Sequence, residues 1–78
     1  MGIKTLLVQI NLRDRSDVSV TNLDLADYLN VTDDERLILS EGSDSVIYKG
    51  RDYKKVNDQT QMARNIPTRL LYYMEIKG

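Results

Sequence analysis

Apolar and polar side chains alternate near both ends of this chain, and that alternation is the strongest constraint on its fold. Near the beginning, the apolar positions spaced two residues apart are Leu6, Val8, Ile10 and Leu12. Near the end they are Leu70, Tyr72, Met74 and Ile76. A period of two residues is typical of a β-strand that buries one face. We therefore predict strands over residues 3–12 and 70–77.

The next segment predicts a turn, a second strand and a short helix. Residues 13–17 read R-D-R-S-D, a polar turn in which Asp and Ser side chains bond to nearby backbone, and the alternation resumes at residues 18–20. Leu25 and Leu29 are four residues apart and follow N-cap residue types, so we predict a helix over residues 22–30. The residues after it predict a second turn or a short cap.

Farther along, the sequence predicts a hairpin, a polar segment and a weak second helix. Residues 36–40 and 45–49 are rich in strand-forming side chains and flank the reversal E-G-S-D. Residues 51–56 are expected to form a short exposed strand or a solvated loop. Residues 57–66 begin with cap-type residues and are predicted as a weak helix that Pro67 must end.

Together these elements predict one small α+β domain over residues 1–78. Its sheet is expected to be mostly antiparallel, with one short central helix and a second weak helix before the C-terminal strand. The side chains expected in the core are Leu25, Leu29, Leu37, Leu39, Val46 and Tyr48. A chain of 78 residues buries a limited share of its surface, and forming an intertwined dimer would widen its stability margin.

Composition narrows the classes of function. The chain has no Cys and no His, which removes disulfides, thiolate metal sites and the commonest general base. We therefore expect a non-enzymatic protein with no cofactor and no metal. The apolar run near the N-terminus is too short for a signal peptide or a membrane span, so a cytoplasmic protein without membrane contact is expected. The net charge of −1 argues against nucleic-acid binding through bulk charge alone.

The order of elements over residues 8–50 resembles that of the AbrB/MazE-like swapped-hairpin DNA-binding family. That family places a strand of the type V-x-V-P before a helix with L-x-x-x-L-G-I, a polar cap with Asp and a hydrophobic hairpin. The matching residues here are Val18, Val20, Leu25, Leu29, Asn30, Val31 and the runs 32–35, 37–39 and 46–48. The resemblance implies an intertwined homodimer that acts as a transcriptional regulator or antitoxin-like protein. Its first turn, with Arg13 and Arg15, would contact DNA.

A second group of cations follows the predicted hairpin, where aromatic and basic side chains are interleaved. The residues that would extend a DNA interface there are Lys49, Arg51, Lys54 and Lys55. Cations beside aromatic rings suit phosphate contact and base stacking on a sheet surface. The same pattern also fits an edge strand that Lys and Arg protect from edge-to-edge pairing, and the sequence leaves both interpretations open.

The main functional alternative is a protein-binding inhibitor or assembly module of the kind that phages and mobile elements encode. Such a module would act by covering a partner surface. Its expected contact residues are Tyr53, Tyr73, Asp33, Asp34 and Glu35. Aromatic residues are enriched at such interfaces.

A third alternative is a metal-dependent nuclease. Glu75 and Lys77 are two residues apart on a predicted strand, and Asp52 and Asp58 lie upstream of them. Two carboxylates could hold a divalent metal while the amine polarises a water molecule.

Overall fold

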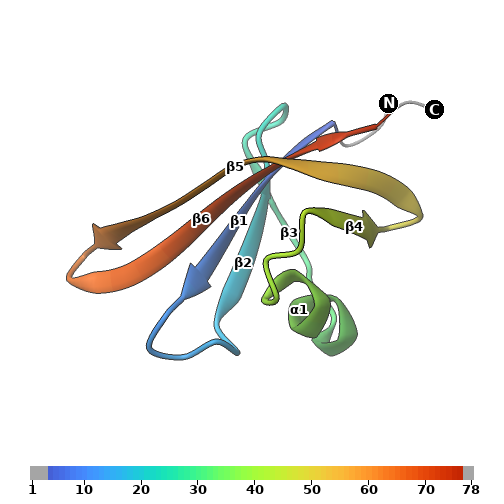
Figure 1. Cartoon of the computed structure of the whole chain (residues 1–78). Coiled ribbons are helices and arrows are strands. Elements are labelled where there is room, and N and C mark those ends of the chain that lie inside the picture. The colour runs from blue at the N-terminus through green and yellow to red at the C-terminus, as the bar shows by residue number, and fades with distance from the viewer. Residues whose placement is uncertain (1–3, 77–78) are drawn as a thin grey trace.

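The computed structural model describes residues 4–76, and over this range it contains a six-stranded sheet and a short helix (Figure 1). The elements in chain order are β1 (Thr5–Asn11), β2 (Val18–Asn22), β3 (Asp27–Leu29), α1 (Asp33–Leu39), β4 (Ser45–Tyr48), β5 (Arg51–Ala63) and β6 (Ile66–Glu75). The strand order is β3-β2-β1-β6-β5-β4, and every neighbouring pair is antiparallel. Two three-stranded meanders therefore meet at the β1–β6 pair. This arrangement confirms the predicted small, mostly antiparallel α+β fold.

The sheet curves into a half-barrel, and α1 lies beneath it between the edge strands β3 and β4 (Figure 1). Leu39, the last residue of α1, is almost fully buried and joins the side chains on the inner face of the sheet. The buried residues of this core are Leu6, Val8, Ile10, Val18, Val20, Leu39, Val46, Tyr48, Tyr53, Leu71 and Tyr73. The helix thus closes the open side of the half-barrel.

The two strands predicted near the ends of the chain are confirmed as β1 and β6. Their pairing places Leu6 opposite Tyr73 and Val8 opposite Leu71, and all four side chains are completely buried. Residues 3 and 77, which the predicted strands included, lie outside the described residues. The turn over residues 13–17 and the strand after it are also confirmed.

The helix predicted over residues 22–30 is wrong. Asn22 ends β2, and its side-chain oxygen accepts a hydrogen bond from the backbone of Asp24 (3.0 Å), which starts a tight turn. Ala26 has a positive φ of 51°, so the chain reverses there and continues as β3. Leu25, expected in the core, is exposed. The helical spacing of the leucines therefore did not correspond to a buried face.

A helix forms instead where residues 36–40 were predicted to be a strand. Thr32 caps α1: its hydroxyl accepts a hydrogen bond from the Glu35 amide, and the Glu35 carboxylate accepts one from the Thr32 amide. This reciprocal capping box satisfies amides that the first turn would otherwise leave unpaired. Leu37 lies on the solvent side of the helix with 67% of its surface exposed. Of the remaining predicted core residues, Leu39, Val46 and Tyr48 are buried, and Leu29 is partly buried.

The predicted hairpin partner of residues 45–49 is consequently wrong as well. β4 pairs with the start of β5 through a two-residue turn at Lys49 and Gly50, whose φ values are 51° and 75°. Two consecutive positive φ values suit the right-handed twist of a tight hairpin. Residues 51–56, left open between strand and loop, are strand, and Tyr53 among them is buried.

The second helix predicted over residues 57–66 is also wrong. β5 continues to Ala63, a second two-residue turn follows at Arg64 and Asn65 with φ values of 53° and 67°, and β6 begins at Ile66. Pro67 is tolerated because it is the second residue of β6 and lies beyond the last β1–β6 pair, Asn11 with Thr68, where its missing amide interrupts no pair. Its carbonyl still accepts a hydrogen bond from the Leu12 amide (2.9 Å). This part of the hairpin is exposed on both faces, so both faces carry polar residues. The sequence therefore lacks the alternation of apolar and polar residues that would have predicted a strand.

The helix α1 is too short and too polar to cross a membrane, and no other helix occurs between residues 4 and 76.

Replacing Leu71 by Ala tests the importance of the β1–β6 core. We expect a loss of about 2–5 kcal/mol in the free energy of unfolding, because truncation of a fully buried leucine leaves a cavity. Urea unfolding followed by circular dichroism measures this loss. Met74→Ala, on the same strand but half-exposed, is the control and should cost far less. Equal losses for the two variants would contradict the assignment of the buried face.

Candidate functional site

The face of the sheet opposite the core, called here the outer face, is uncovered by any element within residues 4–76. Side chains alternate along a strand, so the neighbours of the core residues Val8 and Leu71 point to this face. Those neighbours are Leu7, Gln9, Leu70 and Tyr72. On β3, Tyr28 also points outward, because it pairs with Thr21, the residue after the buried Val20. The outer face is thus a continuous surface running from β3 to β4.

Four large apolar side chains are exposed on the outer face. Tyr28, on the edge strand β3, is 72% exposed, Ile47, on the opposite edge strand β4, is 70% exposed, and Met74 and Ile76 are about half exposed. Ile47 and Ile76 line the same shallow hollow, next to Asp52. Exposed apolar side chains that occur together, as these two do, are typical of an interaction surface.

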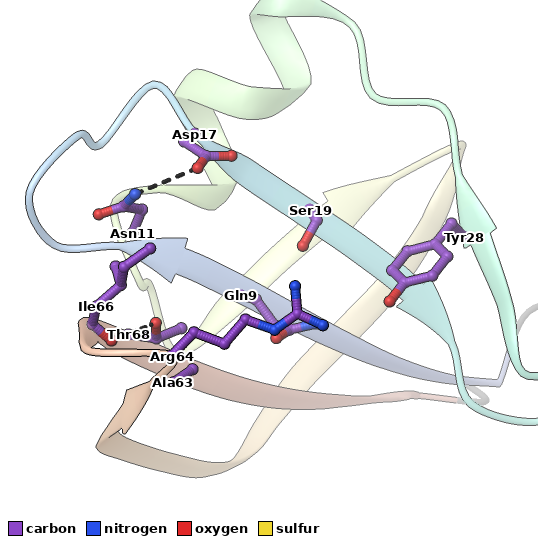
Figure 2. Close-up of a pocket in the computed structure, with 9 residues that line it drawn as sticks. All are labelled: Gln9, Asn11, Asp17, Ser19, Tyr28, Ala63, Arg64, Ile66 and Thr68. Carbon is purple, nitrogen blue, oxygen red and sulfur yellow. Dashed lines mark hydrogen bonds between the residues drawn. The ribbon is translucent and has the colours of Figure 1, made fainter.

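Another part of the outer face forms a polar groove of about 380 Å³ (Figure 2). Its lining residues are Gln9, Asn11, Asp17, Ser19, Tyr28, Ala63, Arg64, Ile66 and Thr68. Gln9 and Ser19 lie on its floor, while Tyr28 from β3 and Arg64 from the β5–β6 turn stand on opposite sides (Figure 2). The groove therefore joins segments that are far apart in the sequence.

The hydrogen bonds within the groove show which of its side chains can bind a ligand. Asn11 donates to the Asp17 carboxylate (3.2 Å), and Thr68 donates to the carbonyl of Ile66 (3.0 Å). The side chains of Gln9, Ser19, Tyr28 and Arg64, by contrast, form no hydrogen bond or ion pair with any described residue. An amide, a hydroxyl, an aromatic ring and a guanidinium thus remain available, a combination suited to binding a peptide or protein surface.

The structure places the residues predicted to bind DNA at two different ends of the sheet. Arg13 and Arg15 lie in the β1–β2 turn, at the same end of the sheet as the β5–β6 turn, and Arg15 lines a hollow together with residues of α1. Their side chains pair with no residue between 4 and 76. Lys49 lies at the other end of β5, over the Tyr48 ring and 3.9 Å from the Glu35 carboxylate. Lys54 points to the outer face, since its register partner is Met74. A single surface containing all the predicted cations is therefore not formed within one chain.

Two of these cations make structural contacts. Arg51 forms an ion pair with Glu75 (2.9 Å). Lys55 is largely buried, and its ammonium group contacts the Gly42 carbonyl (2.9 Å) and the Asp58 carboxylate (3.0 Å). Lys55 also lies 3.4 Å from the Asp44 carboxylate. It therefore holds the loop between α1 and β4 against β5.

Asp58 is the centre of that cluster. Its carboxylate accepts two hydrogen bonds from the Arg69 guanidinium, at 3.0 and 2.6 Å. This pairing, together with Lys55, holds the pKa of Asp58 well below its usual range. The Arg69 guanidinium packs so closely on Gly42 that a Cβ at that position would lie 2.5 Å from Nη1. Gly42 also has a φ of +70°, so both geometry and space require glycine here.

The tyrosines proposed as exposed contact residues are buried. Tyr53 and Tyr73 both have fully buried side chains in the core, which corrects the expectation that they are accessible. The Tyr73 hydroxyl donates a hydrogen bond to the Ser43 carbonyl (2.7 Å), so it also anchors the loop after α1. Burial raises the pKa of Tyr73 to about 12.

The acidic run at residues 33–35 lies in the first turn of α1, where carboxylates favour the positive end of the helix dipole. Asp33 pairs with Arg36 (2.7 Å), and Glu35 belongs to the capping box. Asp34 is exposed. Two of the three acids predicted to contact a partner protein thus have contacts within the helix itself.

The residues of the nuclease alternative are only partly described. Lys77 lies outside the described residues. Asp58 is opposite Leu71, whereas Glu75 is opposite Tyr53 and pairs with Arg51. Asp52 is next to Tyr53 in the sequence, but its side chain lies on the outer face beside Ile47, whereas Glu75 lies on the core face. Among residues 4–76, no three carboxylates gather in a group that could hold a metal ion.

Sequence reasoning missed Tyr28 and Arg64, the two residues on the sides of the groove. Tyr28 was assigned to a helix, and Arg64 to the end of another helix. The signal available for Arg64 was the R-N pair before Ile66 and Pro67, because Asn tolerates the left-handed conformation of a tight hairpin turn.

Comparisons with protein-family models, with curated proteins and with solved structures find no match to this chain. The resemblance to the AbrB/MazE-like family therefore stays a prediction.

The Asp58 cluster makes stability depend on pH. Because its pKa is lowered on folding, Asp58 stabilises the protein above the unfolded value of about 4, and the contribution is lost as the pH falls through the lower folded value. Asp58→Asn should lose about 1–2 kcal/mol at neutral pH and show a smaller decrease on acidification. Urea unfolding at a series of pH values measures both effects.

The control for this experiment is Asp52→Asn, on the same strand, because the Asp52 carboxylate forms no ion pair with any residue from 4 to 76. It should retain the acid dependence of the unsubstituted protein. An acid dependence that is unchanged in Asp58→Asn would contradict a stabilising role for the Asp58–Arg69 pair.

Proposed function

We propose that this chain is a small non-enzymatic protein-binding module, which acts by covering a surface of a partner protein with the outer face of its sheet. The observation that carries the proposal is the exposure of Tyr28, Ile47, Met74 and Ile76 on a face that no element within residues 4–76 covers. Inhibitors and assembly factors encoded by phages or mobile elements are proteins of this kind.

The combination of exposed apolar side chains and a polar groove on one face supports a protein partner. Interface cores are enriched in aromatic and Met side chains and are bordered by polar groups that make hydrogen bonds. Tyr and Arg are also the residue types that most often contribute a large share of binding energy. Tyr28 combines both features, because it is one of the exposed apolar side chains and also lines the groove.

Capture experiments with Tyr28→Ala test this proposal. Tagged protein is used to capture partners from a lysate of the organism that encodes it, and bound proteins are quantified by mass spectrometry. We expect Tyr28→Ala to weaken capture of the specific partner at least about tenfold, because a central aromatic contact typically contributes 2 kcal/mol or more.

Leu37→Ala is the matched control, because Leu37 is as exposed as Tyr28 but lies on α1. It should capture the partner as the unsubstituted chain does. A partner that is lost with Leu37→Ala and kept with Tyr28→Ala would overturn the assignment to the outer face.

A second candidate function is DNA binding by a transcriptional regulator or antitoxin-like protein. The observation that favours it is the presence of Arg13, Arg15 and Arg64 in neighbouring turns, with no hydrogen-bonding or ion-pair partner for their side chains among the described residues. Unpaired guanidinium groups are available to phosphates, and at a base edge they can bind guanine in a bidentate manner.

Fluorescence anisotropy with a labelled DNA duplex distinguishes this candidate. If the turns bind DNA, affinity should fall steeply between low and moderate salt. The double variant Arg13→Ala/Arg15→Ala should abolish binding, whereas Lys49→Ala/Lys54→Ala, which removes the same charge, should retain most of it. Absence of binding even at low salt would exclude the candidate.

A further inference from the structure

The outer edge of β5 is open along much of its length. β5 spans Arg51–Ala63, but its register with β4 covers only Arg51 to Lys54, and one further backbone hydrogen bond joins the Lys55 amide to the Asp44 carbonyl (2.7 Å). Beyond the bulge at Lys55/Asn57, no described strand pairs with this edge. Figure 1 shows this part of the β5–β6 hairpin extending away from β4 and α1.

The backbone groups at this open edge can be identified from the register. The Ile76 amide donates to the Asp52 carbonyl of β5, whereas the Glu75 amide donates to the Lys4 carbonyl. Even-numbered residues of β6 therefore direct their backbone amide and carbonyl groups toward β5. Their partners after the bulge are Asn57, Gln59, Gln61 and Ala63. In an antiparallel pair, alternate residues direct both backbone groups to the same side. The amide and carbonyl groups of Asp58, Thr60 and Met62 therefore face the open side.

Beyond Asp58, this edge lacks the features that usually prevent strand pairing. Exposed edges are commonly protected by Lys, Pro, a β-bulge, short length or an inward-pointing charge, and the bulge and Asp58 lie only at the beginning of this edge. Residues 59–63 read Q-T-Q-M-A and carry no charge and no Pro. Of the two charges that flank this run, Asp58 is neutralised by Arg69 and Lys55, and Arg64 lies in the turn that follows. The other edges differ, because β3 has three residues and β4 has four.

We infer that the open edge of β5 pairs with the same edge of a second copy of this chain, antiparallel about a two-fold axis, to form a homodimer with a continuous sheet. This inference is independent of what the outer face binds. Placing Thr60 opposite Thr60 of the second copy lets the outward-facing residues of both strands exchange about four backbone hydrogen bonds, because the Asp58 amide already donates to the Asn57 side chain (2.9 Å). The same register places Gln59 opposite Gln61 of the second copy, so their amides can bond to each other.

Charge complementarity favours a second copy as the occupant. With Thr60 on the axis, Asp58 lies opposite Met62 of the second copy, so the like charges are not opposed. Lys55 and Asn57 occupy consecutive register positions across the bulge, so the position opposite Lys55 falls at Arg64 of the second copy. The Asp44 carboxylate, which is 93% exposed and lies 3.4 Å from the Lys55 ammonium group, is then placed to oppose both cations, and symmetry repeats this contact.

A cysteine at the axis tests the register. Residues that form a hydrogen-bonded antiparallel pair have Cα atoms about 5.5 Å apart, which suits a disulfide bond. The chain has no cysteine, so Thr60→Cys introduces a single thiol, and under mild oxidation we expect it to form a covalent dimer. Thr21→Cys, on the outer face of β2, is the control and should cross-link much more slowly. Equal rates for the two variants would overturn the register.

Sedimentation equilibrium from micromolar to near-millimolar protein tests the dimer itself. The paired edge is short, so we expect a dissociation constant in the micromolar range or weaker. Thr60→Pro should weaken the dimer more than about tenfold, because it removes an outward amide that the monomer does not use. Met62→Lys, which adds a charge at the same edge, should weaken it as well, and circular dichroism confirms that each variant is folded. A monomer throughout the range, or a dimer unaffected by both variants, would overturn the inference.

Discussion

The antiparallel pairing of β1 with β6 is the interaction on which the rest of the structure depends. It joins residues from Thr5 to Asn11 with residues from Thr68 to Met74. The pairing therefore brings together two segments separated by most of the described chain, and closing so long a loop lowers the conformational entropy of the chain. The cost is offset by the contact of Leu6 and Val8 with the opposite residues of β6 in the core. Without this pair, two three-stranded meanders would each lack an apolar layer to pack on. The curvature of the joined sheet then creates the space that α1 fills.

The helix α1 in turn depends on tertiary contacts. Seven residues are too few for a stable isolated helix, so α1 requires its capping box and the insertion of Leu39 into the core. The loop that follows is held by Lys55 and by the Tyr73 hydroxyl. These contacts account for two residues that sequence reasoning had assigned to binding surfaces. The inner side of the sheet is thus occupied by the fold, and the outer face and the edges remain for recognition.

The sequence correctly predicted the strands in which apolar residues alternate in step with the buried side chains. β1 and β6 each bury one face against the core, so a period of two residues identified them. β3 has only three residues, too few to show a two-residue alternation. The four-residue spacing of Leu25 and Leu29 matched one face of a helix instead. The sequence at the start of α1 contains the capping-box pair Thr32 and Glu35, which is typical of a helix N-terminus. The leucines and isoleucine that follow favoured a strand, and the prediction followed them. The late part of β5 is polar on both faces, so it showed no alternation.

The candidate site was less predictable than the fold, because it depends on register rather than on local sequence. Tyr28 and Arg64 share a groove only because the three strands between β3 and β5, which are β2, β1 and β6, have the pairing observed here. A polar strand exposed on both faces specifies its register weakly. In β5 the register is fixed by other means: the bulge after Lys55, the Asp58–Arg69 ion pair and the tight turn at Arg64. Because these features hold β5 in one position against β6, its open edge presents a single pattern of donors and acceptors, which is the condition for pairing in a defined register.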